Sequence, residues 1–106
     1  MLKKQYLKSR KISKITFEIP KDELPEGVDG RTVHLVGDFN DWDQAATPMK
    51  KLKDGTFKIT LELTPGCEFH FRYLLDGEFW INEWHADRYA SSPFGADNCV
   101  VVTPTE

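Results

Sequence analysis

Three tryptophans stand where the apolar runs of this sequence end. Trp42 follows residues 35–37 and is surrounded by aspartates, whereas Trp80 and Trp84 come shortly after an Asp-Gly pair at 76–77. An indole at such an edge presents a flat apolar face with a polar rim, which complements the C–H patches and hydroxyls of a sugar ring. The positions therefore indicate a sugar-binding surface. For Trp42 alone, packing beneath a loop is an equally good interpretation.

A stacked sugar also needs hydrogen-bonding partners for its hydroxyls, and two side chains could provide them. Arg72 faces outward if its strand alternates, and Asn98 precedes the last apolar run. Guanidinium and amide groups offer donors and acceptors that suit neighbouring hydroxyls. The competing interpretations are a surface ion pair for Arg72, worth roughly 0 to 1 kcal/mol, and a turn position for Asn98.

Metal binding and catalysis have weaker signals. Residues 38–43 match the first two spacings of a calcium loop, but Trp42 replaces the third oxygen ligand, and the required glycine and terminal glutamate are missing. The three histidines share no ligand spacing, and no nucleophile has an evident base. We therefore expect no metal, no cofactor and no catalytic residues.

Glycoside hydrolysis is the enzymatic alternative, because four acids cluster in the sequence. They are Asp76, Glu78, Glu83 and Asp87. Hydrolysis needs two carboxylates roughly 5 to 10 Å apart in a cleft. A small sandwich offers shallow faces instead, so these acids more often only keep loops soluble.

The elements that must position these side chains are strands. Apolar residues alternate with polar ones over residues 15–19, 33–37, 57–63 and 69–75, and a β-branched run follows at 99–103. Asp-Gly and Pro-Gly pairs between the runs are typical of tight turns. No long window has a helical apolar stripe. The pattern predicts an all-β, immunoglobulin-like antiparallel β-sandwich of about seven or eight strands, with a small barrel as the alternative.

Length and charge restrict the organisation and the partners. The 106 residues suit a single domain. The net charge is −3, and residues 1–14 hold six basic side chains and no acid, so the remainder carries −9. An acidic body argues against nucleic acid and anionic membranes as partners. We expect a basic, solvated N-terminal arm at 1–13 and one domain at 14–106; a clamp on an acidic partner is the less favoured role for the arm.

The remaining signals concern location and thiols. No apolar stretch is long enough for a membrane span, and residues 1–30 lack the apolar segment of a secretory signal. We therefore expect a soluble, cytoplasmic protein. Cys67 and Cys99 are far apart and in apolar settings, which favours reduced thiols over a bridge between neighbouring strands.

Four segments in order resemble carbohydrate-binding module family 48, the isoamylase N-terminal or early-set type. They are VHLVGDFNDWD, TPMKKLKDGTFKITLEL, FHFRYLLDGEFWINEWHADRY and SPFGADNCVVV. The family includes the glycogen-binding domain of the AMP-activated protein kinase β subunit, and the resemblance covers about residues 14–103. It implies an immunoglobulin-like sandwich that binds α-1,4-glucans such as glycogen or starch without cleaving them.

The resemblance also implies roles for individual residues. Trp42 ends the FNxW motif and corresponds to one stacking platform of the kinase-type modules. Arg72 takes the place of a lysine, which keeps the charge and changes the geometry. The second platform directly follows the Asp-Gly hairpin, where the register allows Phe79 or Trp80, and we prefer Trp80.

Three more positions complete the implied site. Asn98 matches the asparagine before the final strand. Phe94 falls near the apolar residue that pushes through the ring of a helical glucan, and Ala96 stands where the family has a hydroxyl. In members attached to debranching or branching enzymes, the domain often packs against a catalytic barrel.

The leading hypothesis is thus a stand-alone, noncatalytic module for α-glucan, with a glycogen-metabolising enzyme as a further partner. The alternative is a protein-interaction or regulatory domain of the same fold that has lost sugar binding. A glycoside hydrolase fragment is the least favoured.

Overall fold

The computed structural model of the 106-residue chain describes residues 1–26, 30–92 and 97–105. These residues form nine strands and two single turns of 3-10 helix. In chain order they are β1 (Leu2–Leu7), β2 (Ile12–Ile19), η1 (Lys21–Glu23), β3 (Val33–Gly37), η2 (Asp38–Asn40), β4 (Lys50–Lys51), β5 (Phe57–Leu63), β6 (Glu68–Leu75), β7 (Phe79–Ile81), β8 (Arg88–Ser91) and β9 (Asp97–Val102).

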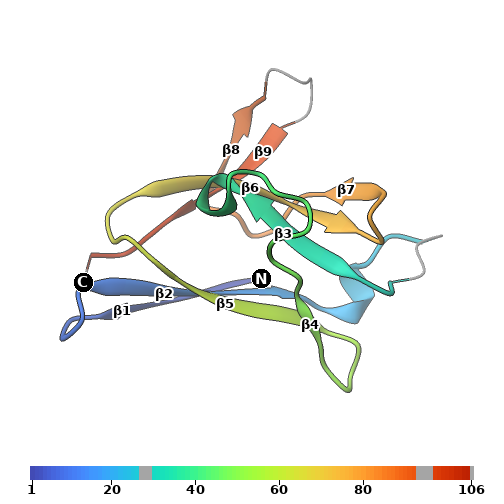
Figure 1. Cartoon of the computed structure of the whole chain (residues 1–106), viewed down its shortest axis with the longest axis horizontal. Helices are drawn as coiled ribbons and strands as arrows, with labels where there is room; N and C mark the ends of the chain where they lie inside the picture. Colours follow the sequence, from blue (N-terminus) through green and yellow to red (C-terminus); the bar gives the residue numbers. More distant parts are fainter. Residues whose placement is uncertain (27–29, 93–96, 106) are drawn as a thin grey trace.

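Two antiparallel sheets face each other (Figure 1). The four-stranded sheet has the order β1-β2-β5-β4, and the five-stranded sheet has the order β3-β6-β9-β8 with β7 also paired to β6. The predicted all-β sandwich is confirmed, and the barrel alternative is wrong because the two sheets remain separate. The strand count exceeds the expected seven or eight.

Alternating side chains of both sheets fill the space between them. Phe17 of β2 meets Phe71 of β6 edge-on, with ring centroids 5.2 Å apart, and Phe71 also contacts the ring of Tyr73. All three rings are buried, together with aliphatic neighbours from β3, β5 and β9. Burying each such side chain contributes roughly 1.5 to 3 kcal/mol, so this layer holds the two sheets in a fixed relation.

The N-terminal segment differs from the expected solvated arm. Residues 2–7 form β1, which pairs with β2 from Leu2 opposite Phe17 to Leu7 opposite Ile12. The expected boundary at residue 13 falls inside β2. The segment joins the sheet because Leu2 and Tyr6 are half-buried while its lysines remain at the surface and pair with acids, as Lys4 does with Asp87 at 2.6 Å.

The β6–β7 turn is fixed by its own sequence. Asp76 and Gly77 both have positive φ angles, 51° and 70°, which suit a tight hairpin. The Asp76 carboxylate accepts hydrogen bonds from the backbone N–H groups of Gly30, Arg31 and Thr32. These bonds, with that of Thr32 the strongest influence, lower the pKa of Asp76. The hairpin that carries Trp80 is therefore tied to the segment before β3.

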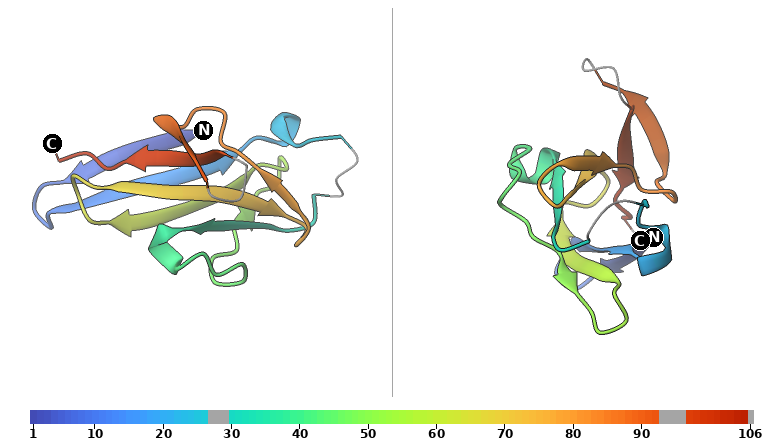
Figure 2. Two further views of the ribbon diagram at one scale, coloured as in Figure 1. Left: turned by 90° about the horizontal axis from the view of Figure 1, so that it is seen from above. Right: turned by 90° about the vertical axis from the view of Figure 1, so that its right-hand side faces the viewer.

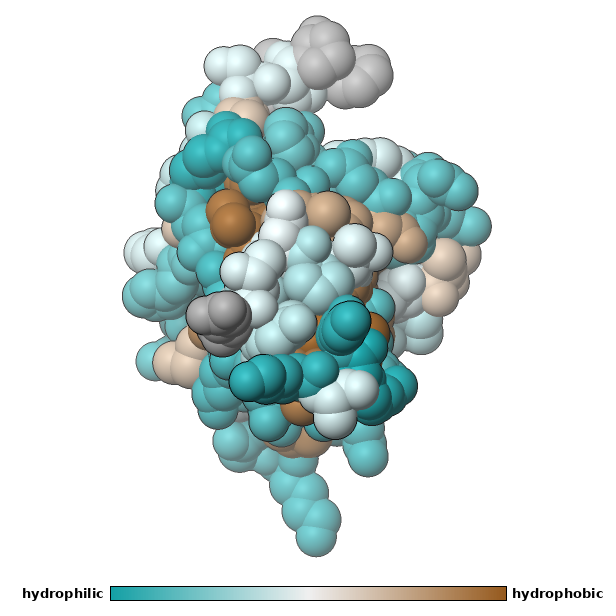
Figure 3. Space-filling model, turned by 90° about the vertical axis from the view of Figure 1, so that its left-hand side faces the viewer, coloured by the Kyte–Doolittle hydropathy of each residue, from teal (hydrophilic) through white to brown (hydrophobic). Residues whose placement is uncertain are grey.

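The β8–β9 hairpin projects away from the two stacked sheets (Figure 2, right). Seen from the end that bears the β1–β2 turn, the surface is mostly hydrophilic, with small separated hydrophobic areas (Figure 3).

Cys67 and Cys99 are free thiols, as expected, and burial raises the pKa of Cys99 to about 11. No helix in the described part of the chain has the length and apolar character needed to cross a membrane.

Candidate functional site

The outer face of the five-stranded sheet gathers three of the predicted site residues. Trp80 of β7 pairs with Leu74 of β6, so it shares a face with Arg72, two residues earlier on β6. Asn98 of β9 alternates with the core residue Cys99 and therefore lies on this same outer face. The view onto this face is given in Figure 2, left.

Beneath these side chains lies a second apolar layer. Val36, Leu74 and Val100 alternate with core residues and so point away from the inter-sheet core, yet they are only 0%, 3% and 0% exposed. The register places Arg72 beside Val36 and Trp80 beside Leu74. Larger side chains thus cover this apolar floor, which we define as Val36, Leu74 and Val100. The floor gives the outer face a desolvated base.

Trp80 and Arg72 interact directly on top of the apolar floor. The Arg72 guanidinium carbon lies over the Trp80 ring, 5.7 Å from the centroid, within the range of a cation–π contact. Trp80 remains 37% exposed. The indole is therefore oriented by a cation and still accessible to a ligand.

The register distinguishes Trp80 from Phe79. Phe79 pairs with Leu75, a residue of the inter-sheet core, and Phe79 is itself exposed at the edge of the sheet. Paired residues share a face, so Phe79 points away from the face that carries Arg72. Of the two aromatic residues that the sequence left open, the structure places Trp80 beside Arg72.

The turn after β3 is closed by one asparagine. Asn40 accepts a hydrogen bond from the Gly37 N–H at 3.1 Å and donates from its amide to the Leu35 carbonyl and the Thr47 hydroxyl at 2.8 and 2.9 Å. The Trp42 N–H in turn donates to the Gly37 carbonyl at 2.9 Å. The chain thereby folds back on itself and brings Trp42 to the end of β3.

The aspartate before this turn fixes the indole itself. The Trp42 indole N–H donates to Asp38 Oδ1 at 2.9 Å, while Asp38 Oδ2 accepts the backbone N–H of His70 on β6 at 2.7 Å. Asp41 and Trp42 both have positive φ angles, 56° and 59°, an unusual conformation for a tryptophan. Trp42 is half-buried. It is thus neither sealed in the core nor fully solvated.

The two indoles are anchored at different points along β6. Trp42 is tied through Asp38 to His70, and Trp80 pairs with Leu74, which is four residues further on and about 13 Å away along the strand. The η2 turn adjoins β3 on one side of β6, and β7 lies on the other (Figure 1). Arg72 comes between these two anchor points. A ligand that follows β6 from one anchor point to the other would therefore pass Arg72.

The remaining predicted positions are described only in part. Asn98 is half-buried on β9 and directly follows Asp97, whose carbonyl oxygen accepts a hydrogen bond from Asn82. Phe94 and Ala96 lie outside the described residues.

Asn82 is a residue that the sequence analysis missed. Its side-chain oxygen accepts a hydrogen bond from Arg72 Nε at 2.7 Å, and its amide nitrogen donates to the Asp97 carbonyl at 3.2 Å. The available signal was its position two residues after Trp80, which would place it on the same face of a continued strand. Asn82 thus links Arg72 to the start of β9.

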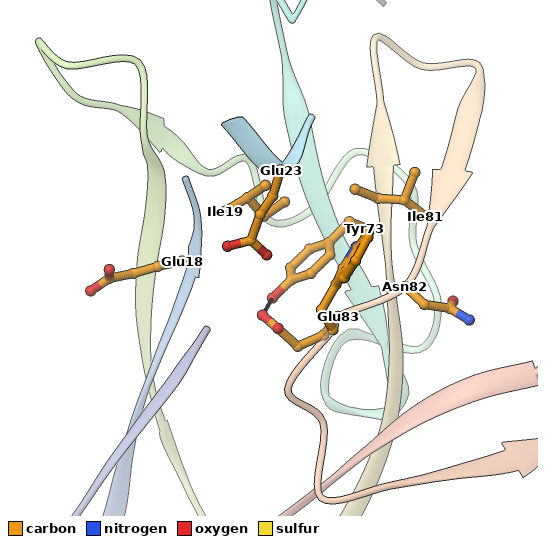
Figure 4. A pocket seen from close by; sticks show the side chains of 8 residues that line it. Glu18, Ile19, Glu23, Tyr73, Ile81, Asn82 and Glu83 are labelled. Carbon is orange, nitrogen blue, oxygen red and sulfur yellow. Dashed lines mark hydrogen bonds between the residues drawn. The ribbon is translucent and has the colours of Figure 1, made fainter. Parts of the chain in front are cut away.

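Three of the four acids considered for hydrolysis make structural contacts, and Glu78 is exposed in the β6–β7 turn. Glu83 is only 2% exposed and accepts hydrogen bonds from the Tyr73 hydroxyl at 2.9 Å, the His85 N–H at 2.8 Å and the Met1 amine. Figure 4 shows Tyr73 and Glu83 directed toward each other in a small crevice. Burial, followed by the Glu83 charge, raises the pKa of Tyr73 well above its ordinary value.

The Asp87 carboxylate also makes contacts within the protein. It pairs with Lys4 and accepts the Val102 N–H at 2.7 Å. Within the described residues, no group of three or more histidine, cysteine, aspartate or glutamate side chains could hold a metal ion. The arrangement on the outer face therefore offers stacking and hydrogen bonding, while Asp76, Glu83 and Asp87 are engaged in contacts within the fold.

Comparison with known proteins identifies the family. The family model described as the glycogen recognition site of AMP-activated protein kinase matches residues 26–104. A search of curated proteins found no match. The matched region runs from before β3 to beyond β9 and includes the entire outer face with Arg72, Trp80 and Asn98. The chain therefore belongs to the family of the glycogen recognition site of AMP-activated protein kinase, and it is a carbohydrate-binding module of that type.

Proposed function

We propose that this module binds α-1,4-glucan, as glycogen, starch or maltooligosaccharide, on the outer face of the five-stranded sheet and does not cleave it. The observation that carries the proposal is the exposed Trp80 indole held under Arg72 above an apolar floor. This arrangement combines a flat apolar surface with a polar cation, the two elements that a glucose ring requires.

Each residue of the proposed site has a separate role. The Trp80 face receives the C–H surface of one glucose unit, and the guanidinium nitrogens of Arg72 that Asn82 does not engage donate to hydroxyls. Asn98 adds an amide on the same face. Trp42 receives a second unit further along the chain of glucose, and the family resemblance implies an apolar contact between Phe94 and the glucan.

The expected affinity is modest. Each net hydrogen bond contributes roughly 0.5 to 1.5 kcal/mol, and the site is an open face, so an oligosaccharide should bind with a Kd on the order of 10 μM to 1 mM. Glycogen presents many chain ends, and repeated contacts will hold it more firmly than a single oligosaccharide.

Affinity electrophoresis in glycogen-containing gels tests the proposal. Trp42→Ala should abolish the retardation of the protein while its thermal unfolding stays close to that of the parent chain. Phe79→Ala is the control, because Phe79 is an exposed aromatic residue next to Trp80 on β7 and faces away from Arg72. Equal retardation of the parent chain and Trp42→Ala would count against the assignment.

The proposal also includes a protein partner. We expect the module to bring glucan to a glycogen-metabolising enzyme. Trp84, 73% exposed in the loop after β7, favours a docking role separate from the outer face. If maltoheptaose leaves every amide chemical shift unchanged while a stoichiometric protein partner is recovered, the domain is an interaction module that has lost sugar binding.

A further inference from the structure

Asn82 lies at a junction of β7, Arg72 and the beginning of β9. It is half-buried, directly follows the last residue of β7, and uses both ends of its side-chain amide. The oxygen accepts from Arg72 Nε, and the nitrogen donates to the backbone carbonyl of Asp97 on β9. The amide therefore has a defined orientation, with its acceptor turned to the arginine.

The hydrogen bond to Asn82 restricts the Arg72 side chain at its Nε atom. The long side chain of an arginine has several rotatable bonds, and fixing them costs conformational entropy. The bond from Nε to Asn82 sets the plane of the guanidinium, and the Trp80 ring 5.7 Å from its carbon supports that plane from one side. The two terminal nitrogens then remain as donors with a fixed direction.

We infer that Asn82 is a positioning residue for carbohydrate recognition, which holds the Arg72 guanidinium over Trp80 in register with β9. The inference rests on the proposed function of this face. Asn82 acts through Arg72, and the ligand gains because the ordering of the arginine precedes binding. The bond to Asp97 keeps the same amide aligned with the strand that carries Asn98.

Two substitutions separate positioning from a merely structural role. Asn82→Ala removes both hydrogen bonds. Asn82→Asp keeps an oxygen acceptor for Arg72 Nε but loses the donor to the Asp97 carbonyl. Positioning predicts that Asn82→Asp retains the orientation of Arg72, whereas a role limited to the Asp97 contact predicts that both variants behave alike.

The first measurement uses the 106-residue chain and requires no sugar. The Nε–H signal of Arg72 is followed by NMR, assigned through its loss in Arg72→Lys. Slow exchange with solvent is expected in the parent chain and in Asn82→Asp, and fast exchange in Asn82→Ala. Equally slow exchange in Asn82→Ala would overturn the inference. Should Asn82→Ala fail to fold, fast exchange in the folded Asn82→Asp variant would overturn it as well.

The second measurement is a titration with maltoheptaose. Asn82→Ala should raise the Kd roughly twofold to fivefold, and Asn82→Asp should recover part of that loss. Gln5→Ala removes an amide from β1 in the other sheet and should leave the Kd unchanged. An unchanged Kd in Asn82→Ala would overturn the inference. Failure of the parent chain to bind would instead contradict the proposed function, while the exchange measurement would still decide whether Asn82 holds Arg72.

Discussion

The outer faces of the two sheets have the same backbone alternation and different chemistry. On the four-stranded sheet, Lys14 lies opposite Glu62 and Lys58 opposite Glu18, while the hydroxyls of a threonine pair approach to 2.9 Å. On the five-stranded sheet, the outward positions include the buried apolar floor and the exposed Trp80. The first face is covered by charged and polar side chains, and the second leaves an aromatic surface open.

This difference favours the five-stranded sheet as the proposed binding face. Exposed charged side chains are satisfied by water and by surface ion pairs, which contribute about 0 to 1 kcal/mol each. An indole and a guanidinium supported by a dry floor present apolar area and donors that a ligand can still use. The comparison therefore supports the proposal that glucan is recognised on the five-stranded sheet.

The largest effect should come from removing the apolar floor. Leu74→Ala should lower the free energy of unfolding by about 2 to 4 kcal/mol, because it deletes a buried side chain beneath Trp80. Thr60→Ala on the other outer face should cost about 0.5 kcal/mol or less. Chemical denaturation measures both values. Equal losses for the two variants would show that the faces do not differ in this way.

Removing the exposed platform should have the next largest effect. Trp80→Ala should weaken maltoheptaose binding roughly tenfold or more, because the stacking surface is lost. Isothermal titration calorimetry gives the affinity. Lys58→Ala on the four-stranded sheet serves as the control, and a comparable loss there would remove the distinction between the faces.

A smaller loss is expected from changing the cation without removing its charge. Arg72→Lys should weaken binding roughly twofold to fivefold, because lysine lacks the planar fork and the Nε donor that bonds Asn82. The titration can be repeated at higher salt, where a loss caused by geometry persists. An affinity equal to that of the parent chain would show that charge alone matters.

The smallest effect concerns pH and the turn that carries Trp80. Backbone N–H donors hold the pKa of Asp76 below its ordinary value in the folded chain. The stabilisation is therefore present above the unfolded pKa and is lost as the pH falls below about 4 through the folded pKa. As the pH is lowered from 5 to 2, the midpoint temperature of thermal unfolding should fall less steeply for Asp76→Asn than for the parent chain.

Asp54, in the turn of the four-stranded sheet, provides the comparison for that experiment. Its pKa is also lowered, chiefly by the backbone N–H of Thr56, but this contact is local. Asp76 instead ties the β6–β7 turn to residues 30–32. Asp54→Asn should consequently change the acid dependence less than Asp76→Asn, and the reverse order would contradict this view of the turns.

Much of the fold could be predicted from alternation, because each strand hides one side of its pleat. The segments at 57–63 and 69–75 correspond to β5 and most of β6. The edge strand β1 was missed because its lysines mask the half-buried Leu2 and Tyr6. A short edge strand needs only one partner, so its pairing leaves a weak trace in the sequence.

The site was less predictable, because its order depends on contacts distant in the chain. Alternation assigns Leu74 and Val36 to solvent, and only the tertiary structure shows that they are covered. The choice between Phe79 and Trp80 needed the register of β7 against β6. Asn82 gains its role from Arg72, ten residues earlier, which no local pattern reveals.

An NMR titration of the 106-residue chain with maltoheptaose tests whether glucan binds the outer face of the five-stranded sheet. We expect shifts at the indole N–H signals of Trp42 and Trp80, the Arg72 side chain and Asn98, while the signals of Thr16 and Thr60 on the four-stranded sheet remain unchanged. Shifts confined to the four-stranded sheet, or no shifts at saturating oligosaccharide, would contradict it.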